Sequence, residues 1–135
     1  MDIGLGGASS KAPAAMASAW AGVSAFAIGL RGSSTNVGRS NESPGIWDLG
    51  LLVGPAFHND IASVVIAAGV DRIGGVDTGA PAQTVVPSQT GIATHAAAAF
   101  IFNAHVGLGV SYTGARGGKN QFTTVTVALR LGRLR

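Results

Sequence analysis

The chain has 135 residues, a length that fits one domain with a sizeable core. Only 11% of its residues are charged, against about 25% in typical soluble domains, which leaves few charges to cover a water-exposed surface. The lack of cysteine excludes a disulfide scaffold and a cysteine-based metal site. The net charge of +3 forms no basic stripe with aromatic residues, which argues against nucleic-acid binding.

The first half of the chain contains two predicted strands before the first long polar segment. Asp2 to Gly7 is a weak strand in which Ile3 and Leu5 alternate with glycine. Ala19 to Arg31 is a stronger one, whose predicted bulky face carries Trp20, Phe26, Ile28 and Leu30. The segment from Ala12 to Leu30 is also free of charge for nineteen residues, which leaves open a transmembrane helix or a signal anchor. The alternation up to Leu30 favours the strand.

Three further strands are predicted in the middle of the chain, over residues 46–57, 61–73 and 91–103. The first has the clearest alternation, with Trp47, Leu49, Leu51 and Val53 on one face and Asp48 and Gly50 on the other. We expect these four apolar side chains to face outward and the other two to face inward. Replacing Leu51 by a charged residue should then block folding into a membrane, whereas replacing Gly50 by serine should have a comparatively mild effect on folding.

The last thirty residues predict a β-hairpin. Large apolar residues take every second position from Val106 to Tyr112 and again from Val125 to Leu131, and a glycine-rich segment over 114–120 joins the two runs.

The two faces of most predicted strands differ in bulk. One face is large and apolar, and the other consists mostly of glycine, alanine, serine and threonine with an occasional charge. This contrast is typical of a narrow barrel with lipid outside and small or polar side chains inside. The sequence therefore predicts an all-β fold, an antiparallel up-and-down transmembrane β-barrel of about eight strands, six or seven of which are visible.

Connection lengths support one domain over 1–135 with a consistent topology. Long polar connections at 32–45 and 74–90 alternate with tight ones at 58–60 and near Ala104. Outer-membrane barrels have long outer loops and short periplasmic turns, so 32–45, 74–90 and 114–120 are predicted outer loops. Residues 1–18 are predicted to be a weak N-terminal strand or a linker.

The segments Gly107-Leu-Gly-Val-Ser-Tyr-Thr113 and Thr124-Val-Thr-Val-Ala-Leu-Arg-Leu131 resemble the closing hairpin of small bacterial outer-membrane β-barrel proteins. The resemblance implies a Gram-negative cell envelope, a lipid bilayer and the barrel insertion machinery as partners, and a location in the outer membrane. The chain departs from that family in ending Leu134-Arg135 rather than in an aromatic residue, and in lacking a signal peptide at its start. A mature or N-terminally truncated chain would explain the missing signal and the strand count.

Several polar residues are predicted to line the interior. Arg31, Asp48, Asp71 and Arg130 fall on the small-residue faces, and opposed charges in a narrow barrel should pair as a network that plugs it, with a polar pore as the alternative. His95 shares such a face, where we expect a hydrogen bond. The predicted aromatic anchors at the membrane interfaces are Trp20, Trp47 and Tyr112, which in a soluble barrel would instead be core residues.

The sequence carries little sign of catalysis. His58, His95 and His105 lack metal-ligand spacing, so no metal or cofactor is indicated. Ser63, Ser111 and His95 fall on interior faces, but the sequence alone does not bring them together. We therefore predict a non-enzymatic outer-membrane barrel with a structural or surface-interaction role. The alternative is a soluble antiparallel β-barrel that binds a small apolar ligand.

Overall fold

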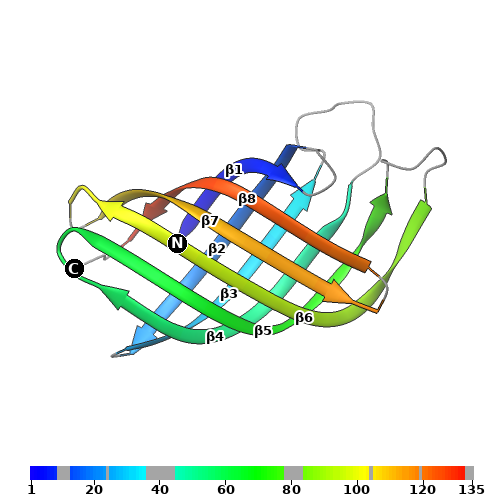
Figure 1. Ribbon diagram of the computed structural model, residues 1–135, viewed down its shortest axis with the longest axis horizontal. Coiled ribbons are helices and arrows are strands. Elements are labelled where there is room, and N and C mark those ends of the chain that lie inside the picture. The colour runs from blue at the N-terminus through cyan, green and yellow to red at the C-terminus, as the bar shows by residue number, and fades with distance from the viewer. Residues whose placement is uncertain are drawn as a thin grey trace.

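The protein folds into a closed antiparallel barrel in the computed structural model, which describes residues 1–8, 13–23, 25–35, 45–77, 84–103, 105–118 and 120–132 (Figure 1). The strands in this part of the chain are β1 (Asp2–Ala8), β2 (Pro13–Val23), β3 (Phe26–Thr35), β4 (Trp47–His58), β5 (Ala62–Asp77), β6 (Thr84–Ile101), β7 (Val106–Gly117) and β8 (Asn120–Leu131). Each strand pairs with the next, and β1 pairs with β8. The predicted up-and-down barrel is confirmed.

Short turns join β2 to β3, β4 to β5 and β6 to β7 at one end of the barrel, where β1 also begins beside the end of β8. Two of these turns have an asparagine that holds the backbone. The Asn59 carboxamide oxygen accepts hydrogen bonds from the amides of Ile61 and of Ala62, the first residue of β5, and Asn103 acts in the same way at the following turn. We call this the terminal end. β3 and β5 end at the opposite end of the barrel, and residues 36–44 and 78–83, which follow them, are outside the described ranges.

The N-terminal third differs from the prediction. Residues 19–31 do not form one strand, because a turn at Ala25 separates β2 from β3, and β2 supplies the strand that the sequence count lacked. The alternative of a helix over 12–30 is wrong, since its described residues lie in these two strands. Among the described residues, no helix is long and apolar enough to cross a membrane.

Strands also extend further than predicted at the end opposite the termini. β3 continues to Thr35, β5 continues to Asp77 and β6 already begins at Thr84. Parts of the predicted outer loops 32–45, 74–90 and 114–120 are therefore paired strand. These paired parts are polar because they lie at the end of the barrel wall, and not because they lack regular structure.

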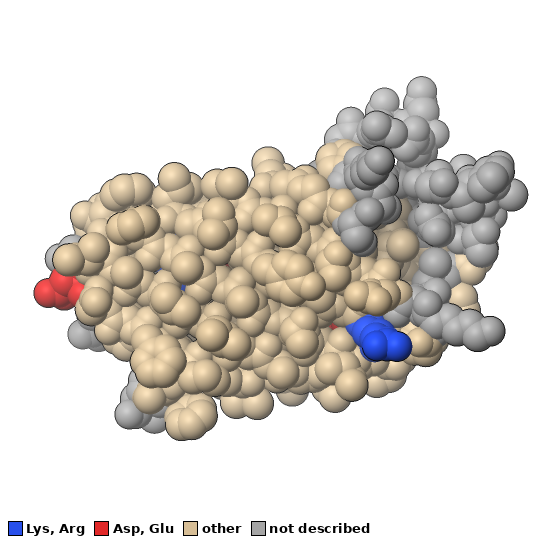
Figure 2. Space-filling model, viewed as in Figure 1, with Lys and Arg blue, Asp and Glu red and all other residues tan. Residues whose placement is uncertain are grey.

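The two faces of the wall are separated as the sequence predicts. On β4, Leu49, Leu51 and Val53 are 58%, 48% and 57% exposed, whereas Asp48 is 3% exposed. The same alternation runs through the other strands, with most large apolar side chains outside. Figure 2 shows a broad band of this exterior that is almost without charge, with charged residues near the two ends of the viewed face. The predicted outward direction of the Leu49 face is confirmed.

Two small apolar clusters fill part of the interior. One contains Leu52, Val65, Ala67 and Ala93, with Trp20 packed against it, and the other contains Ile73, Ala115 and Phe122. A narrow barrel has room for side chains alone at these levels. Apart from Met16 and Ile101, the remaining described interior positions are mostly small or polar.

Candidate functional site

Most of the interior charge lies on one row of register partners that runs from strand to strand around the barrel. Successive inward-facing partners on β8, β1, β2, β3, β4 and β5 are Arg130, Asp2, Ser18, Arg31, Gly50 and Asp71. Adjacent strands lie about 4.8 Å apart, so neighbours on this row are within reach of long side chains. The row brings the charges together in the order positive, negative, positive, negative.

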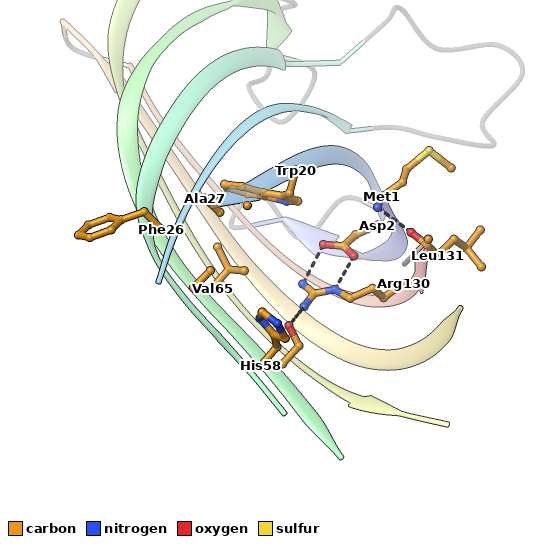
Figure 3. Close-up of a pocket in the computed structure, with 13 residues that line it drawn as sticks. Met1, Asp2, Trp20, Phe26, Ala27, His58, Val65, Arg130 and Leu131 are labelled. Atoms are coloured by element: carbon orange, nitrogen blue, oxygen red, sulfur yellow. Dashed lines mark hydrogen bonds and ion pairs between the residues drawn. The ribbon is translucent and has the colours of Figure 1, made fainter. Parts of the chain in front are cut away.

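The part of the row nearest the terminal end is a fully connected polar cluster. The Arg130 guanidinium donates from Nε and Nη2 to the two carboxylate oxygens of Asp2, at 2.7 and 2.9 Å, and from Nη1 to Ser63 Oγ at 2.5 Å (Figure 3). Ser18 Oγ donates to Asp2 at 3.3 Å and accepts from Trp20 Nε1 at 2.8 Å. Asp2 and Arg130 are both buried, and each charge is compensated by the other.

A second cluster surrounds Arg31. Its guanidinium forms an ion pair with Asp48 and donates to the Thr94 carbonyl oxygen at 3.0 Å, and Ser33 donates to the same Asp48 carboxylate. Both Asp48 and Arg31 are buried. Their pairing makes this cluster the second charged layer of the interior.

Asp71 faces this cluster across Gly50. Gly50 is the register partner of both Arg31 and Asp71, and a Cβ atom at this glycine would lie 3.3 Å from Asp71 Cβ and from Ala93 Cβ. Asp71 interacts electrostatically with Arg31, but neither of its carboxylate oxygens has a hydrogen-bond partner among the described residues. The interior at Gly50 is tighter than predicted. The expectation that a serine at this position has only a mild effect on folding is therefore not supported.

His95 lies inside the barrel, as predicted, but in a different environment. It is 2% exposed, and neither ring nitrogen has a hydrogen-bond partner in the described part of the chain. Its ring packs instead on Trp20, with centroids 5.1 Å apart and an interplanar angle of 34°. The predicted hydrogen bond of His95 is therefore not made to any described residue, and its ring makes an aromatic contact instead.

The structure does not bring the interior serines to His95. Ser63 accepts a hydrogen bond from Arg130, and Ser111 shares one with Thr126 at 2.7 Å. Thr113 and Thr124 make the same kind of contact one level further along β7 and β8. These pairs join strands, and a serine nucleophile with a histidine base is not assembled from them. Within the described ranges, no three histidine, aspartate or glutamate side chains are grouped as a metal site.

The three predicted aromatic anchors separate into two groups. Trp47 and Tyr112 point outward and are exposed, so their role as anchors stays a prediction. Trp20 points inward, contacts Ser18 and His95, and has its ring directly over Gly29, where a Cβ atom would come within 2.3 Å of the indole. The placement of Trp20 on the outer face is wrong, because the turn at Ala25 reverses which positions face inward.

Sequence reasoning missed four members of the two clusters: Asp2, Ser18, Ser33 and Ser63 were not named as parts of a charge network. For Asp2 the signal was present, since it continues the small-residue face of Gly4 and Gly6. For the serines, alternation gives the face but no partner. His58 and His105 lie near turns and are exposed at the terminal end.

Solved structures with the same fold span almost the whole chain. Ail, the attachment invasion locus protein of Yersinia pestis, aligns with a TM-score of 0.67 and 13% identity over 96% of this chain and 94% of that chain. The N-terminal β-barrel domain of Pseudomonas aeruginosa OprF aligns with a TM-score of 0.66 and 12% identity over the same shares. The outer membrane protein Ail in a phospholipid bilayer nanodisc aligns at 0.57 with 15% identity over 96% of each chain. No protein-family model and no curated protein sequence matches the chain. These likenesses confirm the fold of a small bacterial outer-membrane barrel.

Proposed function

We propose that the chain is an integral protein of a bacterial outer membrane, with a structural or surface-interaction role and no catalysis. The barrel would cross the lipid bilayer after delivery by the barrel insertion machinery. The terminal end would face the periplasm and the opposite end the exterior.

The reversed distribution of charge and apolar bulk carries this proposal. Among outward-facing strand residues whose side chains are described, Arg72 and Arg116 carry charge, and both lie near the end opposite the termini. The charged residues Asp2, Arg31 and Asp48 are buried inside instead. A soluble barrel has the opposite arrangement, since contiguous exposed apolar surface of this extent is rare on soluble monomers. A bilayer accepts such a wall because every backbone group of a closed barrel is paired.

The side chains packed inside the barrel support a structural role. The ion pairs of Arg130 and Arg31 and the apolar cluster around Leu52 occupy successive levels of the barrel. The charged groups pair with one another inside the barrel. We therefore interpret these side chains as a plug that stabilises the wall rather than as a pore lining.

Contacts with other molecules would be made at the end opposite the termini. Ail, which shares this fold, has been crystallised in complex with the heparin analogue sucrose octasulfate, with a TM-score of 0.60 and 13% identity to this chain. That structure supports surface interaction as a use of such a barrel.

Amphiphile dependence tests the proposal. The full chain is refolded into detergent micelles and into lipid nanodiscs, and a parallel sample is refolded in buffer alone. We expect a monodisperse, heat-modifiable β-rich species only with detergent or lipid. A monodisperse β-rich monomer in buffer would overturn the proposal and favour the soluble ligand-binding barrel.

A further inference from the structure

The terminal end of the barrel contains an open cavity of about 480 Å³. Its walls come from β1, β2, β3, β4, β5 and β8, and Figure 3 shows the side chains that line it. This volume is in the range of small-molecule sites, which span about 300–1,000 Å³. Part of the plug described above lines this cavity, namely the Asp2–Arg130 pair and Val65 of the Leu52 cluster.

One side of the cavity offers more hydrogen-bond donors than acceptors. Arg130 has five N–H groups and uses three of them in bonds to Asp2 and Ser63. Ser63 Oγ accepts one of these bonds, and its own hydrogen has no acceptor among the described residues. The Asp2 carboxylate is already engaged by Arg130 and by Ser18. This side therefore contains two guanidinium N–H groups and one hydroxyl that have no acceptor among the described residues.

The other side is apolar. Ala27, Ala56 and Val65 line the wall, and Trp20 closes the cavity toward the interior, where it packs on the Leu52 cluster. Trp20 is fixed by its hydrogen bond to Ser18 and by its contact with His95. A rigid aromatic and aliphatic wall opposite a set of donors selects a molecule with one polar head and one apolar body.

We propose that this cavity binds a small carboxylic acid with an apolar body. The carboxylate would accept from the free N–H groups of Arg130 and from Ser63, because hydrogen bonds between ionised partners are the stronger class. The body would lie against Trp20, Val65 and the two alanines. Since the cavity lies inside the barrel, the proposal does not depend on whether the barrel resides in a membrane.

Phenylacetate and its neutral analogue phenylacetamide test the site by NMR. The full chain is labelled with ¹⁵N and refolded in detergent micelles, and the two indole N–H signals are assigned with the Trp47→Phe variant. We expect phenylacetate to shift the Trp20 indole signal saturably and to leave the Trp47 signal in place. Phenylacetamide should bind about tenfold more weakly, because it lacks the charged acceptor. No saturable shift of Trp20, or equal affinity for acid and amide, would overturn the proposal.

Two variants place the ligand in the cavity. Ala56→Phe fills the apolar side and should abolish the shift, whereas Ala68→Phe adds the same bulk on the outward face of β5 and should leave it unchanged. Ser63→Ala should weaken phenylacetate binding several-fold. Unchanged binding to a folded Ala56→Phe protein would contradict the site. If the protein folds in micelles but the titrations show no binding, the ligand proposal is wrong and the proposal that the barrel resides in a membrane is unaffected.

Discussion

Asp2 and Arg130 are 128 positions apart in the sequence and are direct register partners where β1 meets β8. Their two-bonded ion pair lies inside the barrel, at the seam between the first and last strands. The pair couples closure of the barrel to charge compensation, because opening the seam would leave two buried charges without partners.

The seam pair should be costly to break from one side. We expect Arg130→Met to lower the free energy of unfolding by about 3–5 kcal/mol, because Asp2 would remain buried without its partner. The double variant Asp2→Asn/Arg130→Met should be less destabilised than Arg130→Met alone. Urea unfolding in detergent micelles, followed by tryptophan fluorescence, measures both. A double variant that is less stable than the single one would contradict this account of the seam.

The two carboxylates near Arg31 should differ in their contribution to stability. Asp48 is ion-paired with Arg31 and accepts from Ser33, whereas Asp71 has no hydrogen-bond partner among the described residues. In the described interior three aspartates face two arginines, so one carboxylate is in excess. We expect Asp48→Asn to destabilise the barrel by about 3 kcal/mol or more, and Asp71→Asn to change its stability by about 1 kcal/mol at most. The reverse order in the same unfolding assay would show that Arg31 is held mainly by Asp71.

The two tryptophans should report opposite environments in a bilayer. Trp47 points outward, and Trp20 is packed against His95 and Ser18 inside. Brominated lipids should therefore quench the fluorescence of a Trp20→Phe protein, which retains Trp47. They should have little effect on a Trp47→Phe protein, which retains Trp20. Equal quenching of the two variants would contradict the inward placement of Trp20.

A charge on the exterior should be tolerated according to its depth. Leu51 lies in the middle of β4, and Ser34 faces outward near the far end of β3. We expect Leu51→Arg to cost about 2–4 kcal/mol and Ser34→Arg about 0–1 kcal/mol in liposomes. Leu51→Ala serves as the control, because it removes bulk without adding charge. Equal costs for the two arginine variants would indicate that the wall does not cross a bilayer.

The sequence was sufficient where the two faces of a strand differ strongly. On β4 the alternation of leucine and valine with aspartate and glycine gave both the strand and its inward face. On β2 the outward positions 15, 17, 19 and 21 are all alanine and the bulky Met16 and Trp20 point inward, which reverses the contrast seen on the other strands, so β2 was not separated from β3. The short turn between them carries no glycine, proline or asparagine, the residues that usually mark a turn.

For the candidate site, the sequence predicted which side chains point into the barrel but not which of them contact one another. Arg31, Asp48, Asp71, His95 and Arg130 all point inward as expected. Which charges meet depends on strand register around the closed barrel, and alternation along one strand carries no information about that register. Trp20 was misplaced for a related reason. Val23 pairs with Phe26, so even positions face inward on β2 and odd positions face inward on β3.

Spin-label accessibility along β4 is the most direct test of the claim that the apolar exterior of the barrel faces lipid. The chain contains no cysteine, so single cysteines at residues 47, 49, 51, 53 and 57 can be labelled without background. In liposomes, we expect the accessibility to oxygen relative to a water-soluble nickel complex to be highest at Leu51 and to fall toward Trp47 and Phe57. If the nickel complex reaches Leu49, Leu51 and Val53 as readily as oxygen does, these side chains face water and the central claim is wrong.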